Sequence, residues 1–283
     1  MKVVIFCGGF GLRLREASER MPKPMIAVGN RPILLHLMKY YAHHGHTDFI
    51  LCLGYQAQAI KEFFLQFDEA LSNDFVLSNG GRSVELLSQD IDDWRITFVD
   101  TGLQASVGER LLAVRRHLAD DEMFLANYGD QLSDAPLPDL IDRLDRSDSV
   151  ASFLAVRPTY STHVVSLDDD GAVQRVDAMD RVGLLINGGF FVMRREIFDY
   201  LRPGEDLVDE PFQRLIDARK LSAYRYEGFW QPMDTLKDKQ ILDGLFETGR
   251  APWAVWERDR GTIPASERAT ASQLAVALDS ALG

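Results

Sequence analysis

Short apolar segments alternate with amphipathic segments along the first half of the chain. Four apolar runs have the length and composition of buried strands: residues 3–6, 49–53, 96–99 and 123–127. Residues 33–44 and 57–67 carry apolar side chains at helical spacing, and residues 111–118 do so over a shorter stretch. This order predicts an α/β fold, with a Rossmann-like, mostly parallel sheet and helices on both faces.

The second half of the chain is richer in β structure. Its strand-like runs are residues 150–156, 163–167, 172–177, 188–193 and 222–226. Asp169-Asp170-Gly171 is a turn signal between two of these runs, and residues 211–219 have a helical pattern. We therefore predict a smaller β-rich part beside the main sheet.

The pattern changes again after Trp256. Residues 258–268 are polar, and residues 269–282 form an alanine-rich amphipathic segment. The 283 residues suffice for one large domain or two small ones with an ample core. We predict one domain over residues 1–257 and a C-terminal helical extension over residues 258–283.

Composition and charge narrow the functional classes. The chain is 46% hydrophobic and 26% charged, as is ordinary for a globular protein, and its net charge is −12. An acidic protein of this kind is a poor non-specific binder of nucleic acid, although a small basic pocket for a nucleotide remains compatible with it. The sequence contains no secretory signal and no apolar run of the roughly 20 residues that span a membrane. Cys7 and Cys52 lie in apolar runs, as reduced core thiols do, and we expect a cytoplasmic protein without nucleic-acid or membrane partners.

A glycine-rich turn, Gly8-Gly9-Phe10-Gly11, follows the first predicted strand. Glycines allow backbone N–H groups to turn toward an anion, and Arg13 and Lys23 add positive charge nearby. This combination suits a polyphosphate whose negative charge grows during transfer. Leu14 stands where a dinucleotide-binding turn has its third glycine, and no Walker motif is present. On the turn alone, a strand-to-helix connection that requires positive φ explains the glycines equally well.

Two aspartates are candidate ligands of a divalent cation. Asp130 falls just after the fourth predicted strand, and Asp234 lies in the segment 228–235. Ligands of parallel sheets bind at the carboxyl ends of strands, where Gly8, Asp100 and Asp130 would share one cleft. Two carboxylates there would suit Mg²⁺, which prefers oxygen ligands and phosphates. For a lone aspartate, a turn cap or a surface salt bridge is the ordinary explanation.

Further motifs extend in order along the chain as far as Glu257. In sequence they are Gly8-Gly9-x-Gly11-x-Arg13-Leu14, Pro22-Lys23-Pro24-Met25, Pro32-Ile33-Leu34, Val99-Asp100-Thr101-Gly102, Tyr128-Gly129-Asp130, residues 186–192, residues 228–235 and Ala251-Pro252-Trp253. Together they resemble the sugar nucleotidyltransferases, most closely the glucose-1-phosphate cytidylyltransferase branch. The glycine turn and the Lys-Pro pair mark the superfamily, whereas the runs at 187–191 and 228–235 are specific to that branch.

The resemblance implies a reaction and a set of roles. A sugar 1-phosphate oxygen attacks the α-phosphorus of CTP in line, and pyrophosphate leaves. The implied catalytic residues are Arg13, Lys23 and Asp130, and Asp130 and Asp234 would bind Mg²⁺. The implied nucleotide-binding residues are Phe6, Cys7, Gly8, Gly9, Phe10, Gly11, Leu12, Ser106 and Arg110. The implied acceptor-binding residues of the β-rich part are Asn187, Gly188, Glu210, Trp230 and Arg181. Because members of the family tend to form oligomers, the resemblance also implies a homo-oligomer.

The chain departs from the family pattern at the acceptor phosphate. The family's lysine, which pairs with the sugar phosphate, is replaced by Ala178 or Met179, and Asp177 and Asp180 flank that position. Losing one close charge pair costs about 2–5 kcal/mol, so either Arg181 substitutes or the acceptor differs. Residues 158–163 also differ from the family's glycine-rich pocket segment, which favours an altered acceptor.

Two departures fall on the nucleotide side. Leu12 replaces a family threonine, and Glu109 replaces the glycine before Arg110. The Glu109 carboxylate either accepts a hydrogen bond from the cytosine amino group or faces solvent. Two alternative functions remain open: the same transfer with UTP or GTP, and a noncatalytic nucleotide-binding regulatory homologue. Retention of the charged residues of the site favours an enzyme.

Overall fold

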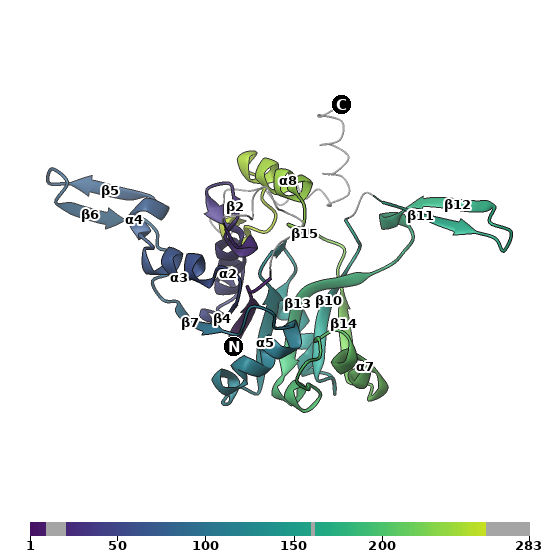
Figure 1. Ribbon diagram of the computed structural model, residues 1–283. Coiled ribbons are helices and arrows are strands. Elements are labelled where there is room, and N and C mark those ends of the chain that lie inside the picture. Colours follow the sequence, from purple (N-terminus) through teal and green to yellow (C-terminus); the bar gives the residue numbers. More distant parts are fainter. Residues whose placement is uncertain (10–20, 160–161, 259–283) are drawn as a thin grey trace.

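A seven-stranded sheet forms the centre of the computed structural model, which describes residues 1–9, 21–159 and 162–258 (Figure 1). Its strand order is β14 (Leu221–Arg225), β10 (Ala151–Val156), β13 (Ile186–Arg194), β8 (Met123–Tyr128), β1 (Lys2–Phe6), β4 (Asp48–Leu53) and β7 (Arg95–Asp100). All pairs in this sheet are parallel except the two that β13 makes. The predicted mixed α/β fold is confirmed, and the predicted extension falls almost entirely outside the described residues.

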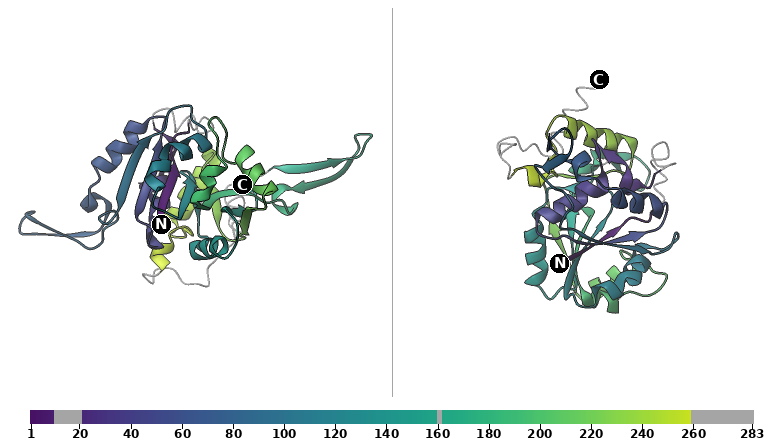
Figure 2. Two further views of the ribbon diagram at one scale, coloured as in Figure 1. Left: turned by 90° about the horizontal axis from the view of Figure 1, so that it is seen from below. Right: turned by 90° about the vertical axis from the view of Figure 1, so that its left-hand side faces the viewer.

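Helices cover both faces of the sheet (Figure 2). The α-helices are α2 (Ile33–His43), α3 (Ala57–Leu65), α4 (Glu69–Ser72), α5 (Val107–Val114), α6 (Leu137–Asp145), α7 (Glu210–Asp217), α8 (Leu236–Glu247) and α9 (Val255–Arg258). The short 3₁₀ helices are η2 (Lys23–Met25), η3 (Arg115–Leu118), η4 (Met179–Arg181) and η5 (Arg195–Asp199). Buried side chains of α2, α6, α8 and α9 share one core cluster, and those of α5 and α7 share the other.

Strand alternation assigns the residues of β1 and β4 to these two clusters. Val3 and Ile5 enter the cluster with α2, whereas Val4 and Phe6 enter the cluster with α5. The same alternation separates the two cysteines, since Cys7 belongs to the first cluster and Cys52 to the second. Both thiols are buried and free, as the sequence predicted.

The strands of the second half divide between two places. The strands β10, β13 and β14 join the central sheet, while β11 (His163–Leu167) and β12 (Val173–Ala178) form an antiparallel hairpin. A second hairpin, which the sequence analysis did not predict, pairs β5 (Phe75–Ser78) with β6 (Ser83–Leu86). Figure 1 shows the two hairpins extending from opposite sides of the body.

Two shorter pairs complete the described fold. The strand β2 (Ala27–Val28) pairs with β3 (Arg31–Pro32), and β9 (Gln131–Ser133) pairs with β15 (Trp230–Pro232). The second pair matters for the site because it joins the end of β8 to a segment a hundred residues later in the chain. Within the described ranges, no helix has the length and apolar character needed to cross a bilayer.

Candidate active site

The carboxyl ends of four parallel strands meet at one edge of the sheet. Beyond the ladders, Cys7 N donates to the Cys52 carbonyl at 2.9 Å, and Gly129 N donates to the Phe6 carbonyl at 3.2 Å. A Cβ on Gly129 would lie 3.2 Å from the Phe6 oxygen and 3.3 Å from Pro24 Cγ. The absence of a side chain at Gly129 thus allows η2 to pack closely against the ends of β1 and β8.

Lys23 and Asp234 reach this edge from distant parts of the chain. Lys23 begins η2, directly after Pro22, whose extended backbone is typical of a helix start. Asp234 follows β15, and the pairing of β15 with β9 continues through a 2.9 Å hydrogen bond from Met233 N to the Asp130 carbonyl. This bond sets Asp234 beside Asp130.

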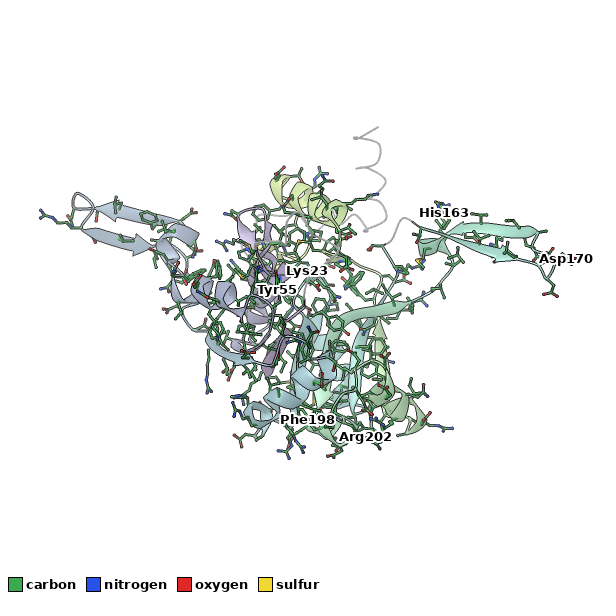
Figure 3. All side chains as sticks on the ribbon, in the orientation of Figure 1. Lys23, Tyr55, His163, Asp170, Phe198 and Arg202 are labelled. Atoms are coloured by element: carbon green, nitrogen blue, oxygen red, sulfur yellow. The ribbon has the colours of Figure 1, made fainter. Side chains whose placement is uncertain are left out.

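The three charged side chains form one cluster. Lys23 Nζ lies 2.5 Å from Asp130 Oδ2 and 2.6 Å from Asp234 Oδ1. The side chains are 13%, 23% and 22% exposed, so the cluster is shielded but open to a ligand. Figure 3 shows Lys23 in the body of the molecule, with His163 and Asp170 marking the two ends of the β11–β12 hairpin. One ammonium against two carboxylates leaves the cluster with a net charge of −1.

The two carboxylates keep Lys23 protonated. Burial by itself lowers the pKa of Lys23, but the charges of Asp130 and Asp234, and their hydrogen bonds, outweigh burial and raise it above its ordinary value. Lys23 therefore remains a cation throughout the physiological pH range. The Lys23 ammonium, held by two carboxylates, can shift to a more negatively charged group, such as a phosphate, when that group binds.

The donor set of this cluster fits a hard divalent cation. Asp130 and Asp234 already converge on one cation, the ammonium of Lys23, and carboxylate oxygens are the ligands that Mg²⁺ prefers. No group of three or more His, Cys, Asp or Glu side chains suited to a metal occurs in the part of the chain that the structure describes. A bound Mg²⁺ would thus take its remaining ligands from water and substrate phosphates, as is usual for this ion.

The described part of the glycine turn, Gly8 and Gly9, follows β1 and lies against Arg110. Gly8 is buried and Gly9 is exposed, whereas Phe10, Gly11, Leu12 and Arg13 lie outside the described residues. Phe6 and Cys7 are buried at the end of β1. Arg110 is only 4% exposed, and its Nη2 donates to the Gly8 carbonyl at 3.1 Å.

Ser106 and Glu109 cap helix α5. Glu109 N donates to Ser106 Oγ at 3.1 Å, and Ser106 N donates to Glu109 Oε2 at 2.8 Å, which is a capping box. Ser106 Oγ in turn donates to the Glu205 carbonyl at 2.6 Å. The Glu109 carboxylate therefore has a structural partner that the sequence analysis did not consider.

The predicted acceptor-binding residues fall into two groups: residues joined by hydrogen bonds near the end of β8, and residues exposed on the surface. Trp230 is 3% exposed, and its Nε1 donates to the Gly188 carbonyl at 2.8 Å. Asn187 Oδ1 accepts from Gly189 N at 2.9 Å, and its amide lies 3.5 Å from the Tyr128 hydroxyl at the end of β8. Glu210, at the start of α7, and Arg181, in η4, are exposed and are not part of this group.

The segment that replaces the family lysine lies at the foot of the β11–β12 hairpin. Met179 N donates to the Thr162 carbonyl at 3.0 Å, and Asp177 forms an ion pair with Arg175. The Arg175 partner offsets part of the negative charge that the sequence places at this position. The exposed Arg181 is one turn away in η4.

Comparison with known proteins identifies the family to which this chain belongs. A sequence model of the family described as nucleotidyl transferase matches residues 2–235. The chain belongs to the nucleotidyl transferase family. The glucose-1-phosphate cytidylyltransferase of Salmonella typhi is 37% identical over 258 residues, which cover 91% of this chain and 100% of that protein. The probable glucose-1-phosphate cytidylyltransferase of Bacillus subtilis (strain 168) is 35% identical over 258 residues, covering 90% and 100%.

The solved structures agree on the fold of this nucleotidyl transferase. A UTP-bound UGPase from Acinetobacter baumannii superposes with a TM-score of 0.65, covering 91% of this chain and 97% of that chain, at 17% identity. The family resemblance that the motifs predicted is confirmed, as is membership of an enzyme family.

Sequence reasoning missed residues that hold the site of this nucleotidyl transferase in place. Asp238 Oδ2 accepts from Asp234 N at 3.1 Å and from Thr235 N at 2.7 Å, which fixes the segment that carries Asp234. The signal was available, because Thr235-x-x-Asp238 is a capping-box pattern. Gly54, directly after β4, was also missed: a Cβ there would lie 2.9 Å from Arg110 Nη1 and 2.9 Å from the Gly8 carbonyl oxygen. A glycine directly after a strand was the available signal.

Proposed function

We propose that this nucleotidyl transferase transfers a cytidylyl group from CTP to a sugar 1-phosphate or a related phosphorylated acceptor and releases pyrophosphate. The proposal rests on one observation above all: Lys23 lies between two carboxylates at the carboxyl edge of the sheet, the edge at which β1 ends in Gly8 and Gly9. The choice of CTP is supported by the two relatives named as cytidylyltransferases, which align over their full lengths.

The chain's own residues supply positioning and charge. Mg²⁺ held by Asp130 and Asp234 would neutralise charge on the triphosphate, as metal ions do in phosphoryl-type transfer. Lys23, released from the carboxylates, then donates to oxygens of the reacting phosphates and stabilises the charge that develops there. The exposed Gly9 amide and Arg13 are placed in sequence to hold the leaving pyrophosphate. No residue needs to form a covalent intermediate, because the acceptor phosphate is itself the nucleophile.

The acceptor side supports an acceptor other than glucose 1-phosphate. No lysine stands near Met179, and Asp177 lies in the same short segment. The cations that remain are Arg181 and Arg175, and the second is already paired. We therefore propose that the acceptor phosphate is bound by Arg181, or that the acceptor differs in shape from the relatives' substrate.

The test measures pyrophosphate release in the presence of Mg²⁺. CTP, UTP, GTP, ATP and dTTP are each assayed with a panel of sugar 1-phosphates and other phosphorylated acceptors. Turnover with CTP supports the proposal, and the acceptor that gives the highest kcat/KM identifies the substrate class. Turnover with UTP or GTP alone would instead assign a different nucleotide. CTP binding without release from any acceptor would favour the noncatalytic regulatory alternative.

We also propose that the protein is a cytoplasmic homo-oligomer. Both projecting hairpins expose apolar side chains, on β5–β6 and β11–β12: Phe75, Val76, Leu77, Val84, Val165, Leu167, Val173 and Val176. A two-stranded hairpin is marginally stable by itself, and exposed apolar patches mark interaction surfaces. Contact with further copies of the chain would bury these side chains.

A further inference from the structure

Arg110 is buried where three loops of the sheet edge meet. It lies on α5, and its guanidinium donates to groups at or just after the ends of three different strands. Nη1 donates to the Leu53 carbonyl at 3.2 Å, to Thr101 Oγ1 at 2.7 Å and to the Gly102 carbonyl at 3.0 Å. Nη2 donates to the Gly8 carbonyl at 3.1 Å. One side chain therefore joins the ends of β1, β4 and β7.

Two glycines make room for this guanidinium. A Cβ on Gly8 would lie 2.0 Å from Arg110 Nη1 and 2.1 Å from Cζ, which is far inside any real contact. A Cβ on Gly54 would lie 2.9 Å from the same Nη1 and 2.9 Å from the Gly8 carbonyl oxygen. The backbone of the turn thus lies directly against Arg110, with no side chain between them.

The charge of Arg110 has no counter-ion beneath the turn. Within residues 1–9, 21–159 and 162–258, no carboxylate forms an ion pair with it, and its acceptors are three carbonyls and one hydroxyl. Burial lowers the pKa of Arg110, but an arginine remains protonated at neutral pH. A positive charge therefore lies directly under Gly8.

The hydrogen bond to Gly8 also decides where the next amide points. In a planar trans peptide the carbonyl of one residue and the N–H of the next point in opposite directions, and the described chain has no cis peptide. Arg110 Nη2, at 3.1 Å, and the Tyr55 N–H, at 3.4 Å, both donate to the Gly8 carbonyl and hold it inward. The Gly9 N–H therefore points outward. Gly9 is exposed, so this amide is open to a ligand at the carboxyl edge of the sheet.

We propose that Arg110 is a positioning residue: it orients the Gly8–Gly9 peptide and locks it to the β4 and β7 loops, so that the turn binds the triphosphate. This role rests on the proposed nucleotidyl transfer, and it differs from direct contact with the base. Its loss would weaken binding of the β and γ phosphates equally for every nucleotide. Discrimination between bases would remain, because Arg110 acts from beneath the turn.

The test compares Arg110→Met with Arg116→Met, an exposed arginine six residues later. Arg110→Met is expected to lower kcat/KM by about 100-fold, the effect of misplacing a binding group by roughly 1 Å. It should raise the inhibition constant of inorganic tripolyphosphate while leaving the ratio of kcat/KM for CTP over UTP unchanged. Arg116→Met should behave as the wild-type protein. A collapse of the CTP:UTP ratio in Arg110→Met would overturn the proposal in favour of base contact.

Hydrogen–deuterium exchange makes the test independent of catalysis. Arg110→Met should accelerate exchange in peptides covering residues 2–9, 50–56 and 99–105 while leaving the rest of the sheet protected. Unchanged exchange in these three segments would overturn the anchoring role, even if the protein proved inactive with every nucleotide. Thr101→Val removes one acceptor at similar volume, and Arg110→Lys retains the charge. Both should show the same pattern at smaller amplitude, which keeps the proposal testable if Arg110→Met does not fold.

Discussion

Replacing Gly8 by alanine is the sharpest perturbation of the candidate site. The added Cβ would lie 2.0 Å from Arg110 Nη1, 2.1 Å from Cζ and 2.5 Å from Nη2. Heavy atoms in contact normally stay about 3.5 Å apart, so either the turn or the guanidinium must move by about 1.5 Å. Overpacking of this kind costs about 1–3 kcal/mol of unfolding free energy. At about 2–4 °C per kcal/mol, Gly8→Ala should lower Tm by roughly 2–12 °C.

Gly9 provides a matched control in the next position. No described atom lies within 4 Å of a Cβ built on Gly9, and neither glycine has positive φ. Gly9→Ala should therefore leave Tm unchanged or raise it slightly, since alanine restricts the unfolded chain. Thermal unfolding followed by circular dichroism, on both variants side by side, measures the difference.

A double-mutant cycle identifies the cause of the Gly8→Ala effect. In an Arg110→Ala background the three atoms nearest to the new Cβ are gone. The cost of Gly8→Ala should then fall by at least about 1 kcal/mol, because residues in direct contact are not additive. Equal stability of Gly8→Ala and Gly9→Ala, or an equal cost in both backgrounds, would refute the close packing of Gly8 on Arg110.

Three further predictions concern charge, pH and assembly. Lys23→Ala should lower kcat by about 10²–10⁴-fold in steady-state assays, as loss of a charge-stabilising group does, whereas Lys61→Ala should not; a near-normal rate for Lys23→Ala would refute its role. Burial of His36 lowers its pKa from 6.5 to about 4, so the unfolded chain binds the proton first and stability is lost as the pH falls below 6.5. Between pH 7 and pH 5 this amounts to about 2 kcal/mol, and urea titrations of His36→Gln should show correspondingly less acid sensitivity than the wild-type protein. Val76→Asp or Val165→Asp should shift the mass in sedimentation experiments toward the monomer, and an unchanged mass for both would count against hairpin-mediated assembly.

Much of the fold could be predicted because the strands of the parallel sheet are short apolar runs between turns. The runs at 3–6, 49–53 and 123–127 fall within β1, β4 and β8, with ends shifted by at most one residue. Such strands are buried on both faces, so their sequence carries the signal directly. The motifs also singled out Lys23, Asp130 and Asp234 as site residues before their contacts were known, and the structure brings the three together.

The elements that sequence reasoning missed carry weaker local signals. The segment of α8 begins with Leu236-Lys237-Asp238-Lys239, where charged residues obscure the apolar face, and α6 contains Pro138 within its first turn. The β5–β6 hairpin has no buried face, so its alternation does not stand out, although its Asn79-Gly80 turn is a hairpin signal. The Asn79-Gly80 turn would have identified the hairpin, and the capping box of Thr235 and Asp238 would have identified the start of α8.

The inward position of Arg110 could not be predicted from local sequence. Its partners follow three different strands, and they come together only when the parallel sheet forms. An arginine on a short amphipathic helix is usually exposed, so the pattern around residue 110 gave no reason to expect burial. Only the glycines at 8 and 54 mark the space that the guanidinium fills.

The central claim is that the α-phosphorus of CTP is attacked by an acceptor phosphate in this site. The most direct measurement follows CTP labelled at the α-phosphate, with Mg²⁺ and the acceptor panel, and separates the products by chromatography. The account predicts that the label passes into a cytidine diphosphate-linked product while unlabelled pyrophosphate is released, and that Lys23→Ala slows this transfer by about 10²–10⁴-fold. Label that remains in CTP, or appears only in CMP, with the wild-type protein would contradict it.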